Sequence, residues 1–201
     1  MIVKVCGMRD AGNIRELEAL GIHWMGMIFW PKSKRFVSVP PSYLPKQTRK
    51  VGVFVDATEE DIRQYVEAYQ LDMVQLHGQE SPDFLKSLKS LTIIKAFNIA
   101  TAEDLQKTAD YEGLADYFLF DTKGKAVGGN GEKFDWSVLD SYHGSTPFLL
   151  SGGIGPEDAS SVKSFRHQKC IGIDLNSRFE TEPGLKDITK IKQFLEEIKQ
   201  V

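Results

Sequence analysis

An aspartate stands directly after a short apolar and aromatic run, because Asp121 follows Tyr117–Phe120. The next segment carries Gly124, Gly128, Gly129 and Gly131 and shows no hydrophobic periodicity. The run has the length of a buried strand, and parallel α/β proteins hold their chemistry in the loops that follow strands. The pattern is compatible with a carboxylate at a pocket mouth under a mobile loop, and equally with an aspartate that caps a turn.

Other polar or reactive residues follow apolar runs in the same way. They are Cys6, Arg35, Asp56, His77, Ser151, Gly152, Gly153, Asp174 and Asn176. If the strands run parallel, the residues at their ends meet at one face of the fold. Cys6 and Asp121 would then share a pocket although they lie far apart in the chain, and packing alone does not explain such a collection.

Two of these strand ends have the character of a phosphate site. S-G-G-I follows the seventh apolar run and D-L-N-S follows the eighth. Small residues expose backbone N–H groups, and a helix N-terminus adds positive potential. Two ordinary glycine turns are the alternative, but the loops after the last two strands of an eight-stranded barrel often bind phosphate.

The side chains of this face suggest further roles. Cys6 acts as a base only if its thiolate is stabilised, and otherwise it is a small buried residue. The guanidinium of Arg35 suits a carboxylate or phosphate, whereas Lys32 and Lys34 read as solvated charges. His77 has no second histidine at metal-ligand spacing, so we expect no metal and a hydrogen bond at the pocket rim. The orientation of Lys4 stays open.

The elements that position these residues alternate along the whole chain. Short apolar runs start near residues 2, 24, 51, 73, 92, 117, 147 and 170, and each is followed by a helical pattern. A short helix near Tyr43 is included in this prediction, as are helices over 101–109, 135–142 and 187–199. Eight such units predict a single compact (β/α)8 TIM barrel over residues 1–201, of class α/β. An open doubly wound sheet is the alternative, but G-x-G-x-x-G does not follow the first run.

Composition limits the function classes. The net charge of −3 among 201 residues creates no basic field for nucleic acid. No apolar run approaches the roughly 20 residues of a membrane helix, and the N-terminus shows no secretory signal. The two cysteines, Cys6 and Cys170, are far apart and fit a reducing cytoplasm. Oligomeric state is left undetermined.

Seven motifs occur together in one order: K-V-C-G-M, F-W-P-K-S-K-R, V-G-V-F-V, V-Q-L-H-G, F-D-T with G-G-N-G-E-K-F-D-W, L-S-G-G-I, and D-L-N-S-R-F-E-T-E-P-G-L-K-D. Together they resemble the phosphoribosylanthranilate isomerase family of tryptophan biosynthesis over nearly the whole chain. The resemblance implies an Amadori rearrangement of a phosphosugar substrate, N-(5-phosphoribosyl)anthranilate, into an aminoketose. It implies no cofactor or metal.

The resemblance also implies roles for individual residues. Cys6 would be the general base and Asp121 the general acid. The implied substrate-binding residues are Arg35 facing the anthranilate carboxylate, His77 and Asp174 in the pocket, and Gly152, Gly153, Asn176 and Ser177 at the phosphate. The loop from Lys123 to Gly131 would close over the site. Arg178 departs from the family pattern, where we expect glycine, and it either adds charge to the phosphate site or points into solvent.

Two other functions remain as alternatives on the same barrel. One is another phosphosugar isomerase, such as the histidine-pathway enzyme, which resembles two half-barrels with an aspartate at the ends of strands one and five. Here those strands end at Cys6 and at Phe97-Asn98, which argues against it. The other is a non-catalytic protein that binds a phosphate ligand.

Overall fold

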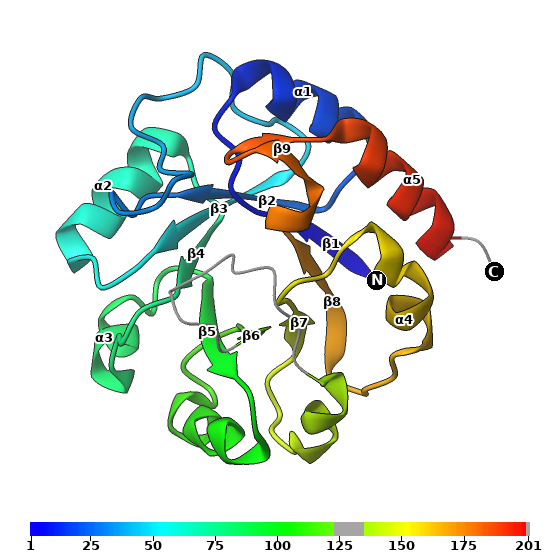
Figure 1. The fold of residues 1–201 in the computed structure, drawn as a ribbon. Helices are drawn as coiled ribbons and strands as arrows, with labels where there is room; N and C mark the ends of the chain where they lie inside the picture. The colour runs from blue at the N-terminus through cyan, green and yellow to red at the C-terminus, as the bar shows by residue number, and fades with distance from the viewer. Residues whose placement is uncertain (123–134, 200–201) are drawn as a thin grey trace.

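The protein is described by a computed structural model, which covers residues 1–122 and 135–199. Its centre is a closed barrel of eight strands in which each strand pairs in parallel with the next and β8 pairs with β1 (Figure 1). The strands are β1 (Ile2–Val5), β2 (Trp24–Ile28), β3 (Arg49–Phe54), β4 (Met73–Leu76), β5 (Ile93–Ile99), β6 (Tyr117–Thr122), β7 (Phe148–Leu150) and β8 (Cys170–Leu175). The predicted barrel is therefore confirmed and the open sheet is excluded.

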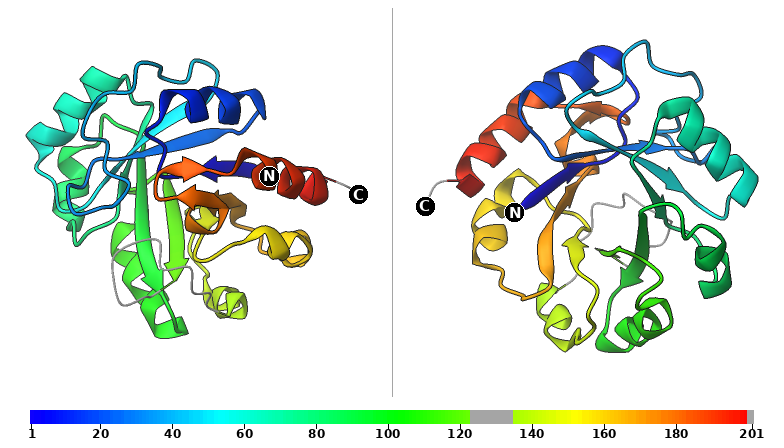
Figure 2. Two further views of the ribbon diagram at one scale, coloured as in Figure 1. Left: turned by 45° about the horizontal axis from the view of Figure 1, so that its top comes forward. Right: turned by 180° about the vertical axis from the view of Figure 1, so that it is seen from behind.

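Helices cover the outside of the barrel (Figure 2). They are α1 (Ala11–Ala19), α2 (Glu59–Tyr69), α3 (Pro82–Ser87), α4 (Ala159–Ser164) and α5 (Ile188–Lys199), with 3₁₀ helices η1 (Ala102–Tyr111), η2 (Trp136–Ser141), η3 (Pro156–Asp158) and η4 (Ser177–Phe179). A short antiparallel hairpin of β9 (Glu180–Glu182) and β10 (Leu185–Lys186) follows η4. Side chains cap the first three α-helices, since Asp10, Thr58 and Ser81 each accept a hydrogen bond from the backbone N–H three residues later.

Two sequence predictions differ from the structure. The short helix expected near Tyr43 is absent, because residues 41–48 form bends and irregular chain with prolines at positions 40, 41 and 45. A proline lacks the N–H of a helix interior and disfavours the helical conformation of the residue before it. The segments expected as helices over 101–109 and 135–142 are helical, but they are 3₁₀ helices. A single domain over residues 1–201 stays a prediction.

The core has two parts, which the two-residue period of the strands separates. The larger part lies between the barrel and its helices and includes Val5, Val74 and Phe120. The smaller part fills the barrel interior and consists of Trp24, Val51, Met73, Ile94, Ala96, Leu119 and Leu149. These interior side chains occupy one end of the barrel, which leaves the strand C-termini for polar groups.

Candidate active site

In two strands the inward-facing side chains change from apolar to polar toward the strand C-terminus. In β4, Met73 belongs to the interior core, so Gln75 and His77 point inward after it. In β6, Asp121 follows the interior Leu119 with the same spacing. Two-residue alternation thus brings residues from separate runs to the mouth of one barrel.

Cys6 lies at this mouth and is almost fully buried. A Cβ placed on Gly26 in the neighbouring strand β2 would lie 2.8 Å from Cys6 Sγ, so the glycine leaves the space that the sulfur occupies. Burial raises the pKa of the Cys6 thiol, although the positive charges of Lys4, Lys186 and Arg35 act in the opposite direction. In the free protein Cys6 is therefore a thiol surrounded by cations that favour its thiolate.

The open question about Lys4 is answered by an ion pair inside the barrel. Lys4 Nζ lies 2.9 Å from Asp174 Oδ1, and the lysine side chain has no exposed surface. The two residues are also register partners between β1 and β8. Burial lowers the pKa of Lys4, but Asp174 and Cys6 together outweigh that effect and the pKa is raised. Lys4 therefore stays charged beneath Cys6, and Asp174, a predicted substrate residue, is its partner.

His77 and Asp121 face each other, with 3.5 Å between His77 Nε2 and Asp121 Oδ2. On the other side of the ring, Gln75 Nε2 lies 3.4 Å from His77 Nδ1. With the amide nitrogen donating, Nδ1 accepts and the neutral ring carries its proton on Nε2. Burial lowers the pKa of His77 to about 4, and the charges of Lys95 and Lys4 add to the effect. His77 is thus a neutral ring whose Nε2 faces Asp121 at a distance too long for a hydrogen bond, and the hydrogen bond expected for it at the rim is the one with Gln75.

Arg35 is held by a carboxylate of the hairpin that follows β8. Its Nε lies 2.8 Å from Glu180 Oε1 and its Nη2 lies 2.6 Å from Glu180 Oε2. Lys186 Nζ is 2.6 Å from Glu180 Oε1. These bonds use the Nε/Nη2 edge of the guanidinium, so Glu180 does not occupy its Nη1/Nη2 edge, which is suited to a second carboxylate.

The predicted phosphate loops also lie at the strand C-termini. Gly152 and Gly153, which follow β7 after Ser151, have φ values of +88° and +71°, which glycine adopts readily. Asn176 follows β8 and precedes the 3₁₀ turn that starts at Ser177, and its Oδ1 accepts from Lys186 Nζ at 2.8 Å. All nine predicted site residues therefore lie at the C-terminal side of the barrel. Three further residues contact them there and were not predicted from the sequence, namely Glu180, Lys186 and Gln75.

Comparison with known proteins identifies the family. The model of the family described as N-(5'phosphoribosyl)anthranilate (PRA) isomerase matches residues 3–197. The chain belongs to this family. A relative from Parabacteroides distasonis, named N-(5'-phosphoribosyl)anthranilate isomerase, is 53% identical, and the match covers 98% of this chain and 93% of the relative.

Solved structures of the family have the same fold. The phosphoribosyl anthranilate isomerase from Thermotoga maritima superimposes with a TM-score of 0.84 at 31% identity, covering 100% of both chains. Another family structure, a complex with reduced 1-(o-carboxyphenylamino)-1-deoxyribulose 5-phosphate, gives a TM-score of 0.81 at 29% identity and also covers 100% of both chains.

The remaining sequence predictions have separate outcomes. Arg178, the departure from the family pattern, pairs with Glu157 at 2.6 Å on the half-exposed surface. The loop from Lys123 to Gly131 lies outside the described residues. Within residues 1–122 and 135–199, no group of three or more His, Cys, Asp or Glu side chains is arranged to hold a metal ion. None of the helices in these two ranges has the length and apolar character that crossing a membrane requires.

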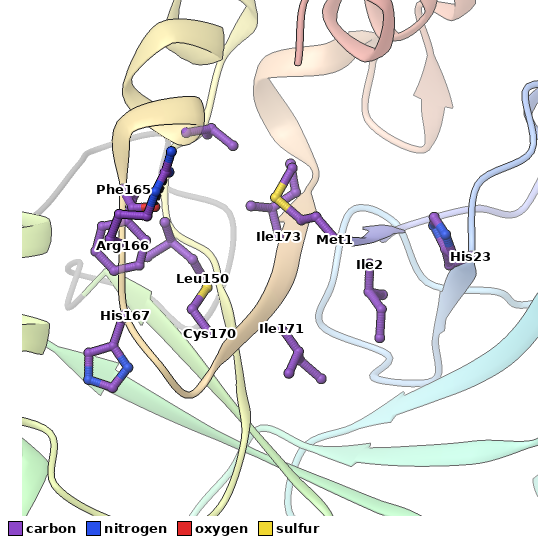
Figure 3. Close-up of a pocket in the computed structure, with 11 residues that line it drawn as sticks. Met1, Ile2, His23, Leu150, Phe165, Arg166, His167, Cys170, Ile171 and Ile173 are labelled. Atoms are coloured by element: carbon purple, nitrogen blue, oxygen red, sulfur yellow. Dashed lines mark hydrogen bonds between the residues drawn. The ribbon is translucent and has the colours of Figure 1, made fainter. Parts of the chain in front are cut away.

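A separate cavity of about 520 Å³ lies beside the starts of β1 and β8 (Figure 3). Met1, Ile2, Cys170 and Ile171 line it from the barrel, and Phe165 and His167 line it from the segment after α4. These strand starts are at the end of the barrel opposite Cys6 and Asp121. The cavity is therefore distinct from the candidate active site.

Proposed function

We propose that the protein isomerises N-(5'-phosphoribosyl)anthranilate to 1-(2-carboxyphenylamino)-1-deoxyribulose 5-phosphate, with Cys6 and Asp121 as its catalytic pair. The observation that carries this proposal is their common position at the mouth of the barrel, in a chain whose family match spans residues 3–197. A base and an acid on separate strands are what an Amadori rearrangement requires, because it adds one proton and removes another.

The first step opens the ribose ring. Asp121 gives its proton to the ring oxygen, the bond from C1′ to that oxygen breaks, and the nitrogen lone pair forms a C=N⁺ iminium. Asp121 becomes a carboxylate in this step. The N–H of neutral His77, 3.5 Å away, then faces the new negative charge. A hydrogen bond to a charged acceptor is stronger than one to a neutral acceptor, so His77 favours this product of the step.

The second step moves the hydrogen of C2′. The thiolate of Cys6 takes the C2′ proton, the electrons of that bond form a C1′=C2′ double bond, and the iminium electrons return to nitrogen. The resulting enol becomes the ketone when C1′ gains one proton and the 2′-hydroxyl loses one, so the whole rearrangement leaves the number of protons unchanged. Burial favours the protonated thiol of Cys6. The positive charges of the iminium, Lys4 and Lys186 act in the opposite direction and favour its thiolate.

The remaining residues account for the two anionic ends of the substrate. Arg35 faces the anthranilate carboxylate with the guanidinium edge that Glu180 does not use. Gly152, Gly153, Asn176 and Ser177 bind the phosphate, and Asp174 and His77 line the pocket between the two ends. The phosphosugar is a small molecule. The net charge of −3 creates no positive field that would attract nucleic acid. Two free cysteines fit a cytoplasmic location.

Loss of fluorescence from freshly formed phosphoribosylanthranilate tests this function directly. We expect rapid loss with the unmodified protein and a rate lowered roughly 100- to 10,000-fold in Cys6→Ser and Asp121→Asn, the range for one acid or base. Cys170→Ser is the matched control, since Cys170 lies at the start of β8, at the other end of the barrel. Circular dichroism checks that each variant is folded.

Each contrary result has its own meaning. Full activity in Cys6→Ser would remove the thiol from the mechanism but leave the reaction assigned. An unmodified protein that binds the reduced product and turns over no substrate would instead be a phosphate-ligand binding protein. Activity on the corresponding histidine-pathway aminoaldose alone would indicate the other isomerase.

A further inference from the structure

Lys186 is a buried cation at the candidate active site that favours the Cys6 thiolate by its charge and is assigned no contact with a reacting atom. Its side chain has no exposed surface, although lysine is among the residues most rarely buried. Its Nζ lies 2.6 Å from Glu180 Oε1 and 2.8 Å from Asn176 Oδ1. One ammonium group thus contacts the partner of Arg35 and a residue of the candidate phosphate loop.

The backbone of Lys186 is fixed from the opposite end of the chain. Asn13 Oδ1 accepts from Lys186 N at 2.8 Å, and Asn13 Nδ2 donates to Lys186 O at 2.9 Å. Asn13 lies on α1 and is buried. A Cβ placed on Gly7 would lie 3.4 Å from Lys186 Nζ and 2.7 Å from Arg35 Cδ. The ammonium is therefore held next to the residue that follows Cys6.

The charges around Lys186 do not balance. Lys4 and Asp174 form a neutral pair, but Arg35 and Lys186 carry two positive charges against the single negative charge of Glu180. Burial lowers the pKa of Lys186, and the attraction of Glu180 only partly offsets it. A buried net positive charge is costly until an anion is bound beside it. One substrate carboxylate at Arg35 supplies that anion.

We propose that Lys186 is a positioning residue that makes the site specific for a ligand with a carboxylate at one end and a phosphate at the other. Through Glu180 it orients Arg35 and leaves the pair with a net positive charge for the carboxylate. Through Asn176 it fixes the loop that receives the phosphate. This proposal rests on the proposed function, because that function supplies a substrate with both groups.

The test compares two ligands that differ only in the carboxylate. One is reduced 1-(o-carboxyphenylamino)-1-deoxyribulose 5-phosphate and the other is its aniline analogue, which lacks the carboxylate. Titration calorimetry gives both dissociation constants for the unmodified protein, Lys186→Gln, Lys186→Arg and Lys190→Gln. Lys190 is the matched control, because it is a half-exposed lysine of α5 whose partner is Asp187.

We expect the unmodified protein to prefer the carboxylated ligand strongly. Lys186→Gln should lower that preference roughly tenfold or more, as removal of one buried charge from a binding site does. It should also raise KM for the substrate more than it lowers kcat, because Lys186 contacts no reacting atom. Lys186→Arg, which keeps the charge, should retain most of the preference, and Lys190→Gln should match the unmodified protein.

Two results would overturn the proposal. One is an unchanged ligand preference in folded Lys186→Gln, and the other is a loss of kcat alone. A crystal structure of the unmodified protein with the carboxylated ligand gives a second test that does not depend on the folding of any variant. It should show Lys186 Nζ still bonded to Glu180 and Asn176, and a carboxylate on Arg35; Glu180 turned away from Lys186 would contradict the proposal. Because binding needs no turnover, an inactive unmodified protein would count against the proposed function only.

Discussion

His77 Nε2 lies 3.5 Å from Asp121 Oδ2, and the pKa of the imidazole is about 4 because the ring is buried. The ring is thus neutral throughout the range in which an ordinary histidine titrates, near 6.5. The ring beside the proposed acid therefore presents an N–H group whose charge does not change near neutral pH.

The depressed pKa of His77 predicts a pH dependence of stability. Between pH 6.5 and about 4 the unfolded chain binds a proton at His77 that the folded protein does not bind, so stability falls as the pH falls. The difference of about 2.5 pKa units corresponds to about 3 kcal/mol. Urea unfolding at pH 7 and pH 4.5 should show a smaller loss in His77→Asn than in the unmodified protein. The exposed His143→Asn variant should behave like the unmodified protein, and equal losses in all three would contradict the prediction.

The raised pKa of Cys6 predicts a thiol that reacts slowly. Iodoacetamide modifies the thiolate, and burial disfavours that form in the free protein. Mass spectrometry after timed alkylation should show Cys6 reacting slowly at neutral pH, with a rate that rises at higher pH than in the same chain unfolded in urea. A pH dependence equal to that of the unfolded chain would contradict the prediction, because the cations around Cys6 would then cancel the effect of burial on its pKa.

The space that Gly26 leaves for the sulfur predicts a specific effect of one methyl group. Gly26→Ala would place a Cβ 2.8 Å from Cys6 Sγ, so the thiol has to move. We expect a stability loss of about 1–3 kcal/mol from overpacking, together with a fall in kcat/KM. Gly12→Ala, on the exposed side of α1, adds a methyl group in a helix and should retain full activity. Normal activity in Gly26→Ala would mean that the position of the sulfur is not critical.

A buried carboxylate outside the barrel supports the strand end that carries His77. Glu80 accepts from Asp56 N at 3.0 Å, from Gly78 N at 3.0 Å and from Lys95 Nζ at 3.0 Å. Glu80→Ala leaves the buried Lys95 ammonium uncompensated and should cost about 3–5 kcal/mol in denaturant unfolding. The exposed pair of Asp83 and Lys86 is the matched control, and Asp83→Ala should change the stability far less than Glu80→Ala does. A similar cost for both variants would contradict a supporting role of Glu80.

The sequence predicted the barrel and the strand-end residues well, because both follow from local patterns. Eight apolar runs with helical patterns between them determine the fold class, and the residue after each run lies at the same end of the barrel. The catalytic roles of Cys6 and Asp121 came from the family resemblance and remain proposals. Neither residue type nor spacing separates a catalytic thiol from a buried one.

The sequence left the orientation of Lys4 open and did not indicate Lys186 or Glu180 as site residues, and both outcomes have a physical reason. Lys4 alternates with apolar neighbours, and only its partner Asp174, 170 residues away, shows that it points inward. Lys186 and Glu180 lie on a hairpin of polar sequence that resembles a surface turn. Hydrogen bonds from distant segments make them part of the site, since Lys186 bonds to Asn13 of α1 and Glu180 bonds to Arg35. Gln75 precedes His77 by two positions, so the two side chains lie on the same face of the strand. The motif V-Q-L-H-G was therefore sufficient to predict that Gln75 lies beside His77.

The pairing of β1 with β8 also sets the order in which the site forms during synthesis. At roughly 5–20 residues per second, a ribosome needs roughly ten seconds or more to pass from Lys4 to Asp174. During that time Lys4 lacks its partner carboxylate and the first strand lacks its pairing with β8, so the first strand cannot take its final place. The environment of the Cys6 thiol is therefore completed only when the eighth strand and the hairpin after it have been made. An incomplete chain contains the thiol but lacks the charged groups that surround it in the folded protein.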